Sequence, residues 1–160
     1  MKLSSLVPSV LAAAGVAVTM SSFNPADAAS VGFKVDQQIS GDTTPITFDV
    51  GLTDVSGGVQ IDLSVAPSSA NTGDIFGAFF NLSMNPQSIS GFNVTGSDVT
   101  DWEFNTNNMG GGNNVTPAGP FDVGVTFGTS GSSGGLLTST SFLVSGVDVS
   151  KFLDAHTTKG

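Results

Sequence analysis

Apolar residues alternate with polar residues along several short segments of this chain. The alternation has a period of two in four runs, at residues 31–35, 46–52, 59–65 and 121–127. This period is typical of a β-strand with one face on an apolar core and the other in water. Clusters of Gly, Ser, Asn, Asp and Pro, such as 56–58 and 67–69, lie between the runs and favour turns. The four runs therefore predict half-buried strands.

Four less regular segments also predict strands, at residues 74–82, 88–95, 99–104 and 138–145. Gly77 and Gly91 lie inside two of them, where an interior glycine favours a bulge or a bend. The only segment that favours a helix is Asp148 to Ala155, with Asp148 or Ser150 as its cap. About eight short strands with almost no helix predict an all-β fold, an antiparallel β-sandwich of the cohesin-like or jelly-roll kind.

The second and third alternating runs predict a hairpin with two possible registers. A four-residue loop over 55–58 pairs Asp54 with Val59. We favour this register because Gly57 and Gly58 supply positive-φ positions for the turn.

The tighter register of the same hairpin creates a candidate metal site. It pairs Val50 with Ile61 and places Asp49 directly opposite Asp62. Two opposed carboxylates repel each other unless a cation lies between them, and Ca²⁺ prefers such oxygen ligands. Asp49 and Asp62 are therefore the candidate metal ligands, and the site disappears in the register that we favour.

The N-terminal segment 1–29 has the three parts of a bacterial export signal. A lysine at position 2 precedes an apolar stretch over 6–20, and an A-x-A site follows at 26–28. The alternative is a membrane anchor. A 15-residue helix over 6–20 would span about 22 Å, however, and this is shorter than the hydrocarbon core of a bilayer, which is about 30 Å thick. We expect cleavage after Ala28 or Ala29, which leaves one soluble domain over 30–160 in the periplasm or outside the cell.

Composition narrows the possible partners. The chain has four Lys and Arg against thirteen Asp and Glu, a net charge of −9, and no cysteine. Binding to nucleic acid or to an anionic membrane requires clustered basic residues, so neither partner is expected. Thiol catalysis and cysteine-type metal sites are excluded, and no cofactor is expected. The acidity indicates solubility outside the cell, with Ca²⁺ binding as the alternative.

One motif resembles a catalytic site. Residues 131–135 fit the G-x-S-x-G pattern around Ser133, and Asp148 and His156 follow in the order of a hydrolase triad. That motif needs a helix after the nucleophile, whereas 136–145 predicts a strand. We therefore expect a hairpin turn here and no catalytic residue.

The segment around the single tryptophan carries the other candidates. Asp101 and Glu103 alternate with Trp102, so their carboxylates are expected on a solvated strand face rather than in a glycosidase site. Carbohydrate is often bound by exposed Trp or Tyr, which makes Trp102 the candidate ligand residue. Trp102 shares a strand face with Thr100 and Phe104, however, and this favours a core position. After this strand, the Asn- and Gly-rich segment 105–120 predicts a long loop, either functional or mobile.

Three segments resemble sequences of a known group of proteins. They are Gly73–Leu82 (GDIFGAFFNL), Phe121–Gly131 (FDVGVTFGTSG) and Leu137–Phe142 (LTSTSF). Similar strings occur in exported bacterial β-sandwich proteins, many of which carry a C-terminal PEP-CTERM sorting tail. The resemblance covers about residues 70–154. It implies an exported, cohesin-like sandwich of mostly unassigned function and brings no catalytic residues.

The chain departs from that group at its C-terminal end. Group members continue past the region of Phe152 with a further strand and often a Pro-Glu-Pro tail, whereas this sequence ends at 156–160 without either. We expect the sheet to lack a strand, which leaves an edge that another chain could fill. Self-association or pairing with a partner is therefore possible.

Taken together, the sequence predicts an exported, non-enzymatic β-sandwich that acts as a structural or interaction module of the cell envelope or extracellular matrix. Its expected partners are proteins or polysaccharides of the envelope. The alternatives are a carbohydrate-binding module and a Ca²⁺-dependent adhesion domain.

Overall fold

The computed structural model describes residues 29–37, 45–106, 121–128 and 136–152. Together these residues form eight strands in two antiparallel sheets. The strands are β1 (Ser30–Gln37), β2 (Ile46–Val55), β3 (Gly58–Val65), β4 (Gly77–Phe80), β5 (Asn93–Thr95), β6 (Val99–Thr106), β7 (Phe121–Phe127) and β8 (Ser139–Ser145). The predicted all-β sandwich is therefore confirmed.

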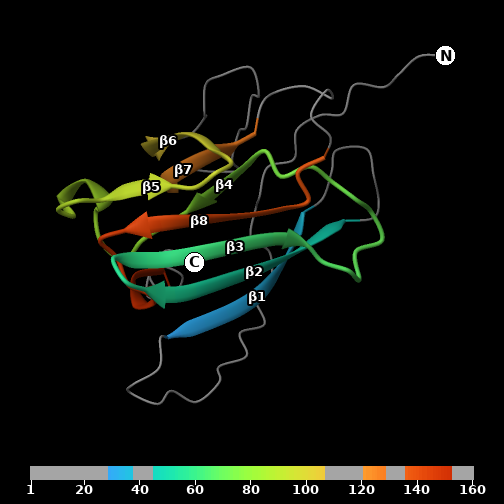
Figure 1. Cartoon of the computed structure of the whole chain (residues 1–160), viewed down its shortest axis with the longest axis horizontal. Helices are drawn as coiled ribbons and strands as arrows, with labels where there is room; N and C mark the ends of the chain where they lie inside the picture. Colours follow the sequence, from blue (N-terminus) through green and yellow to red (C-terminus); the bar gives the residue numbers. More distant parts are fainter. Residues whose placement is uncertain (1–28, 38–44, 107–120, 129–135, 153–160) are drawn as a thin grey trace.

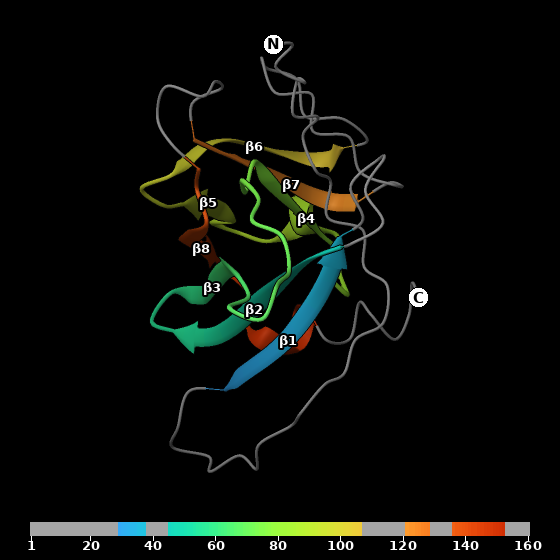
Figure 2. The ribbon, with the colours of Figure 1, turned by 90° about the vertical axis from the view of Figure 1, so that its right-hand side faces the viewer.

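The two sheets differ in size and form the two layers of the molecule. Sheet A has five strands in the order β1-β2-β3-β8-β5, and sheet B has three in the order β4-β7-β6. In Figure 1, sheet A crosses the front of the molecule, with β1 lowest and β5 uppermost. Figure 2 shows sheet B above sheet A after a quarter turn. The chain passes between the two sheets directly from β5 to β6.

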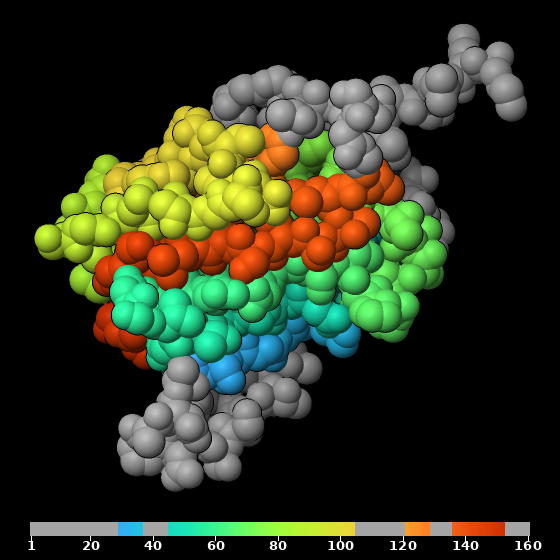
Figure 3. Space-filling view, in the orientation of Figure 1, coloured from blue at the N-terminus to red at the C-terminus, as the bar shows by residue number. Residues whose placement is uncertain are grey.

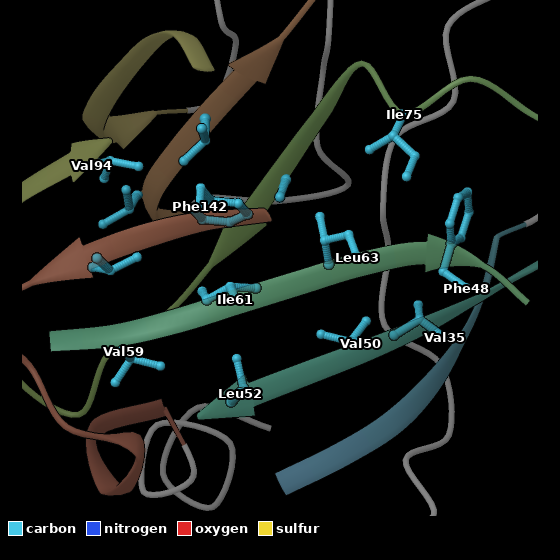
Figure 4. Packing of buried hydrophobic residues seen from close by; sticks show 14 of the residues in the cluster. Val35, Phe48, Val50, Leu52, Val59, Ile61, Leu63, Ile75, Val94 and Phe142 are labelled. Carbon is cyan, nitrogen blue, oxygen red and sulfur yellow. The ribbon is translucent and has the colours of Figure 1, made fainter. Parts of the chain in front are cut away.

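The core lies between the sheets and follows from the alternating pattern. The inward-facing residues of β2 and β3 are almost fully buried, as are those of β7 and β8. Figure 4 shows several of these side chains meeting between the sheets. Phe127 of sheet B contacts Phe142 of sheet A, with ring centroids 5.2 Å apart. Burial of each such side chain stabilises the fold by roughly 1.5–3 kcal/mol.

The β2–β3 hairpin adopts the favoured register. Asp54 pairs with Val59, so the favoured register is confirmed, whereas the expected four-residue loop is wrong: Val55 also pairs with Gly58, which leaves a two-residue turn at 56–57. Gly57 has a φ of 93°, as the turn requires. The expected positive φ at Gly58 is wrong. Glycine is needed there for space, because a Cβ atom would lie 2.1 Å from the carbonyl oxygen of Val144.

Two of the less regular strands are shorter than predicted. Segment 74–82 contributes only β4, because its first residues turn toward sheet A. There the amide of Ile75 donates to the carbonyl of Leu137 at 2.8 Å. The strand predicted over 88–95 is mostly wrong. A 3₁₀ turn (η1, Pro86–Ser88) comes first, and Gly91 has a φ of 74°, which leaves a strand of only three residues, β5.

The remaining segments agree more closely with the prediction. β6 and β8 match their predicted ranges, and β6 continues through 105–106, the start of the predicted loop. The rest of that loop, 107–120, lies outside the described residues. The predicted C-terminal helix is present over 149–152, and its last three positions also fall outside. Within the described residues, no helix has the length and apolar character needed to cross a bilayer.

Candidate interaction surface

The two candidate metal ligands lie on the outer face of sheet A and do not face each other. Asp49 is opposite Ser64, and Asp62 is opposite Gly51. Asp49 instead forms an ion pair with Lys34 of the neighbouring strand β1. The facing pair that the tighter register would create is therefore not formed. Within the described ranges, no three His, Asp or Glu side chains gather in a metal-binding group.

The candidate ligand residue Trp102 faces the core. It belongs to β6, lies opposite Val125 of β7 and is half-buried. Its ring packs edge-on against Phe104, with centroids 5.0 Å apart, and against Phe92 at 5.5 Å. Trp102 thus occupies the core-facing position that the strand pattern favoured, and it fills the corner between β5 and β6.

The other candidates for chemistry are dispersed. Asp101 and Glu103 are exposed on the outer side of β6, as predicted. Asp148 accepts a hydrogen bond from the hydroxyl of Ser150 at the start of the C-terminal helix. Ser133 and His156 lie outside the described residues, so the resemblance to a hydrolase triad gains no geometric support.

Four other aspartates have structural roles that the sequence did not reveal. Each carboxylate accepts a hydrogen bond from a residue far away in the chain and so fixes a loop or a strand end. The pairs are Asp54 with the amide of Val149 (2.8 Å), Asp74 with the amide of Leu137 (2.7 Å), Asp98 with the hydroxyl of Thr140 (2.9 Å) and Asp122 with the amide of Leu82 (2.9 Å). Two of these bonds join the segments that carry the family resemblance, which β4–β7 pairing also brings together.

The outer face of sheet A is a broad polar surface. Figure 3 shows it across the front of the molecule. Its side chains are mostly short and hydroxylated or acidic, and they come from all five strands. They include Lys34, Asp36, Thr47, Asp49, Thr53, Gln60, Asp62, Ser64, Thr95, Ser139 and Ser141.

The sheets end in four edge strands, which are β1 and β5 in sheet A and β4 and β6 in sheet B. An edge strand presents backbone N–H and C=O groups on its outer side, and another strand can pair with them. β4 and β5 contain only four and three residues, whereas β1 and β6 contain eight each. Only β1 and β6 are therefore long enough to offer an extended ladder.

The edge of β6 is capped by a side chain of the same strand, which accepts a hydrogen bond from an outward-pointing amide. The amide of Phe127 in β7 donates to the carbonyl of Phe76, just before β4. Successive residues of a central antiparallel strand bond to opposite neighbours, so Phe127 bonds toward β4 and Thr126 bonds toward β6. Because Thr126 is paired with Asp101, the next amide along β6, that of Trp102, points to the open edge. The Asp101 carboxylate accepts this amide at 2.9 Å. A bulge between Val99 and Asp101 also interrupts this strand.

The edge of β5 is capped in the same way. The amide of Gly146 donates to the carbonyl of Gly57, so Val144 bonds to β3, and its neighbours Ser145 and Leu143 bond to Asn93 and Thr95. The amide of Val94, which lies opposite Val144, therefore points outward. The side-chain oxygen of Asn93 accepts it at 3.0 Å. At each of these two edges, one outward-pointing amide therefore donates to the side chain of the preceding residue, which is Asn93 in β5 and Asp101 in β6.

The edge of β1 is different. The amide of Asp54 donates to the carbonyl of Ala29 at 2.8 Å, so alternate residues of β1, starting from Val31, bond to β2. The amides of Gly32, Lys34 and Asp36 therefore point to the open edge. Within the part of the chain that the structure describes, no side chain caps them as at β5 and β6.

Comparison with known proteins adds no functional assignment. No protein-family model, no curated protein and no solved structure matches this chain. The function must therefore be inferred from the geometry of the chain itself.

Proposed function

We propose that this protein is an exported, non-enzymatic β-sandwich that acts as a structural or interaction module of the cell envelope or extracellular matrix. The observation that carries the proposal is the edge of β1. It is an eight-residue strand whose outward backbone groups carry no side-chain cap within the described residues, in a molecule that caps the outward amides of Val94 in β5 and Trp102 in β6. A β-sandwich can bind partners by adding a strand at such an edge.

Three further observations support this proposal. The polar outer face of sheet A adjoins the β1 edge, so a partner that pairs with β1 also reaches a broad hydrogen-bonding surface. The export pattern of segment 1–29 ends directly before β1, which begins at Ser30. The aspartates at 54, 74, 98 and 122, four of the thirteen acidic residues, accept hydrogen bonds that hold the fold together, which fits a structural role for these carboxylates.

Cell fractionation tests this function. The chain is produced in a bacterium with its own N-terminal segment, and each fraction is probed with an antibody and by intact mass. We expect a shortened protein in the periplasmic, envelope or matrix fraction. Full-length protein that remains in the cytoplasm would overturn the proposal.

Ligand measurements separate the two alternatives from this function. A Ca²⁺-dependent adhesion domain would show a higher melting temperature with Ca²⁺ than with Mg²⁺. A carbohydrate-binding module would be retained on envelope polysaccharide and lose that retention in Trp102→Ala. For the proposed module we expect neither effect, since Asp49 is held by Lys34 and Trp102 packs against two phenylalanines.

A further inference from the structure

We infer that two copies of this protein associate through β1, with the two β1 strands antiparallel about a two-fold axis. This inference rests on the proposed function and names the partner as a second copy of the chain. The joined sheets would form one continuous sheet of ten strands, since sheet A has five and β1 is its outermost strand.

Comparison of the four edges selects β1. β4 and β5 are too short for a stable ladder, and β5 and β6 each have one outward amide that a side chain caps, that of Val94 and that of Trp102. Charge also separates the two long edges. In an antiparallel pair of β6 strands, Asp101 and Glu103 would meet carboxylates of the other copy, and directly opposed like charges are destabilising. β1 instead carries opposite charges, Lys34 and Asp36, two positions apart on the outer face of the sheet.

A two-fold axis between the two β1 strands requires every contact to occur twice. The backbone groups of Lys34 and Asp36 point to the open edge, so these residues form the hydrogen-bonded pairs with the second strand. One register places Lys34 opposite the partner subunit's Asp36, and the symmetry repeats this contact on the other side of the axis. Val35 then lies opposite the same residue of the second copy.

The ion pair already present on sheet A fits this register. Lys34 lies opposite Asp49 of β2 on one side, and the partner subunit's Asp36 would lie on its other side. Each ammonium group would therefore lie between two carboxylates, in a row that crosses the dimer axis. The Lys34 side chain is 59% exposed in the single copy, so it can reach the second carboxylate.

The predicted dimer is weak and depends on concentration. One pair of edge strands buries an area at the low end of specific interfaces, and each copy carries a net charge of −9. Light scattering on the protein recovered after expression with its own N-terminal segment measures the association. We expect the average mass to double between about 1 µM and about 500 µM. A monomer throughout this range would overturn the inference, whatever fractionation shows about export.

Charge reversal tests the register. In a dimer of Asp36→Lys, lysines at positions 34 and 36 face each other at both symmetric contacts. In a dimer of Lys34→Asp, aspartates face each other at both contacts. Each variant should dimerise at least about tenfold more weakly than the wild type. Glu103→Lys makes the same charge change on the exposed side of the β6 edge and should leave the dimer unchanged.

Mixing the two variants provides the decisive experiment. In an equimolar mixture, a dimer of one Asp36→Lys copy and one Lys34→Asp copy again has opposite charges at both contacts between positions 34 and 36. One copy supplies both lysines and the other supplies both aspartates. Native mass spectrometry should therefore show the mixed dimer while each variant alone is monomeric. If Lys34→Asp unfolds through loss of its ion pair with Asp49, the comparison of Asp36→Lys with Glu103→Lys still decides. A mixture that stays monomeric, or equal weakening by Glu103→Lys, would overturn the register.

Discussion

The carboxylate of Asp122 accepts a hydrogen bond from the amide of Leu82 at 2.9 Å, although the two residues are 40 positions apart in the chain. In return, the side-chain oxygen of Asn81 accepts the amide of Asp122 at 3.0 Å. The two bonds fix the end of β4 to the start of β7. β4 has only four residues, so this clamp is a substantial part of its attachment to sheet B.

Loss of the Asp122 carboxylate is expected to destabilise the protein. Asp122→Ala removes a charge-assisted acceptor and leaves the amide of the fully buried Leu82 unpaired, so the free energy of unfolding should fall by about 1.5–3 kcal/mol. Urea denaturation monitored by Trp102 fluorescence measures the change. Asp62→Ala, at an exposed position of β3, is the control and should stay within about 0.5 kcal/mol of wild type. Equal losses in both variants would contradict a clamp at Asp122.

The absence of a side chain at Gly58 is expected to be essential. In Gly58→Ala the new Cβ would lie 2.1 Å from the carbonyl oxygen of Val144 and 2.9 Å from the Cα of Ser145. Both atoms are backbone, so β3 and β8 must separate locally, at a cost of about 2 kcal/mol or more. Thermal unfolding measures the effect. Gly32→Ala is the control, because its Cβ would have no neighbour closer than 3.8 Å and should change the melting temperature little.

The contact between Phe127 and Phe142 links the two sheets. Phe127 is 1% exposed and its ring centroid lies 5.2 Å from that of Phe142, so Phe127→Ala should cost about 3–5 kcal/mol. A double-mutant cycle with Phe142→Ala should give a coupling of about 0.5–1.5 kcal/mol. Additive effects of the two substitutions would show that the sheets are held together elsewhere.

The elements that the sequence predicted well are those governed by local pattern. The alternation over 46–65 is sufficient to predict β2 and β3, and Gly57 determines the loop and hence the register. In the same register Asp49 and Asp62 do not face each other. The register of the hairpin alone is therefore sufficient to rule out the facing pair of carboxylates. The position of Trp102 also follows from the parity it shares with Phe104.

The elements that the sequence did not predict depend on contacts between distant segments. Gly91 turns the chain out of the strand predicted over 88–95, and the pattern of apolar residues does not show this turn. The hydrogen bond from Leu137 to Asp74 joins residues 63 positions apart. The caps on Val94 and Trp102 are meaningful only once β5 and β6 are known to be edge strands. The open edge of β1 could therefore be recognised only from the sheet order.

The contacts of Ala29 lead us to predict one of the two expected cleavage positions. The carbonyl of Ala29 accepts the amide of Asp54 at 2.8 Å, and Ala29 packs half-buried against the core. Cleavage after Ala28 keeps this hydrogen bond, whereas cleavage after Ala29 removes its acceptor and exposes the amide at the end of β2. We predict that the exported protein begins at Ala29, and N-terminal sequencing checks this. A chain that begins at Ser30 should be less stable to urea by about 0.5–1.5 kcal/mol. An exported protein that begins at Ser30 would show that the export machinery, and not the fold, selects the cut.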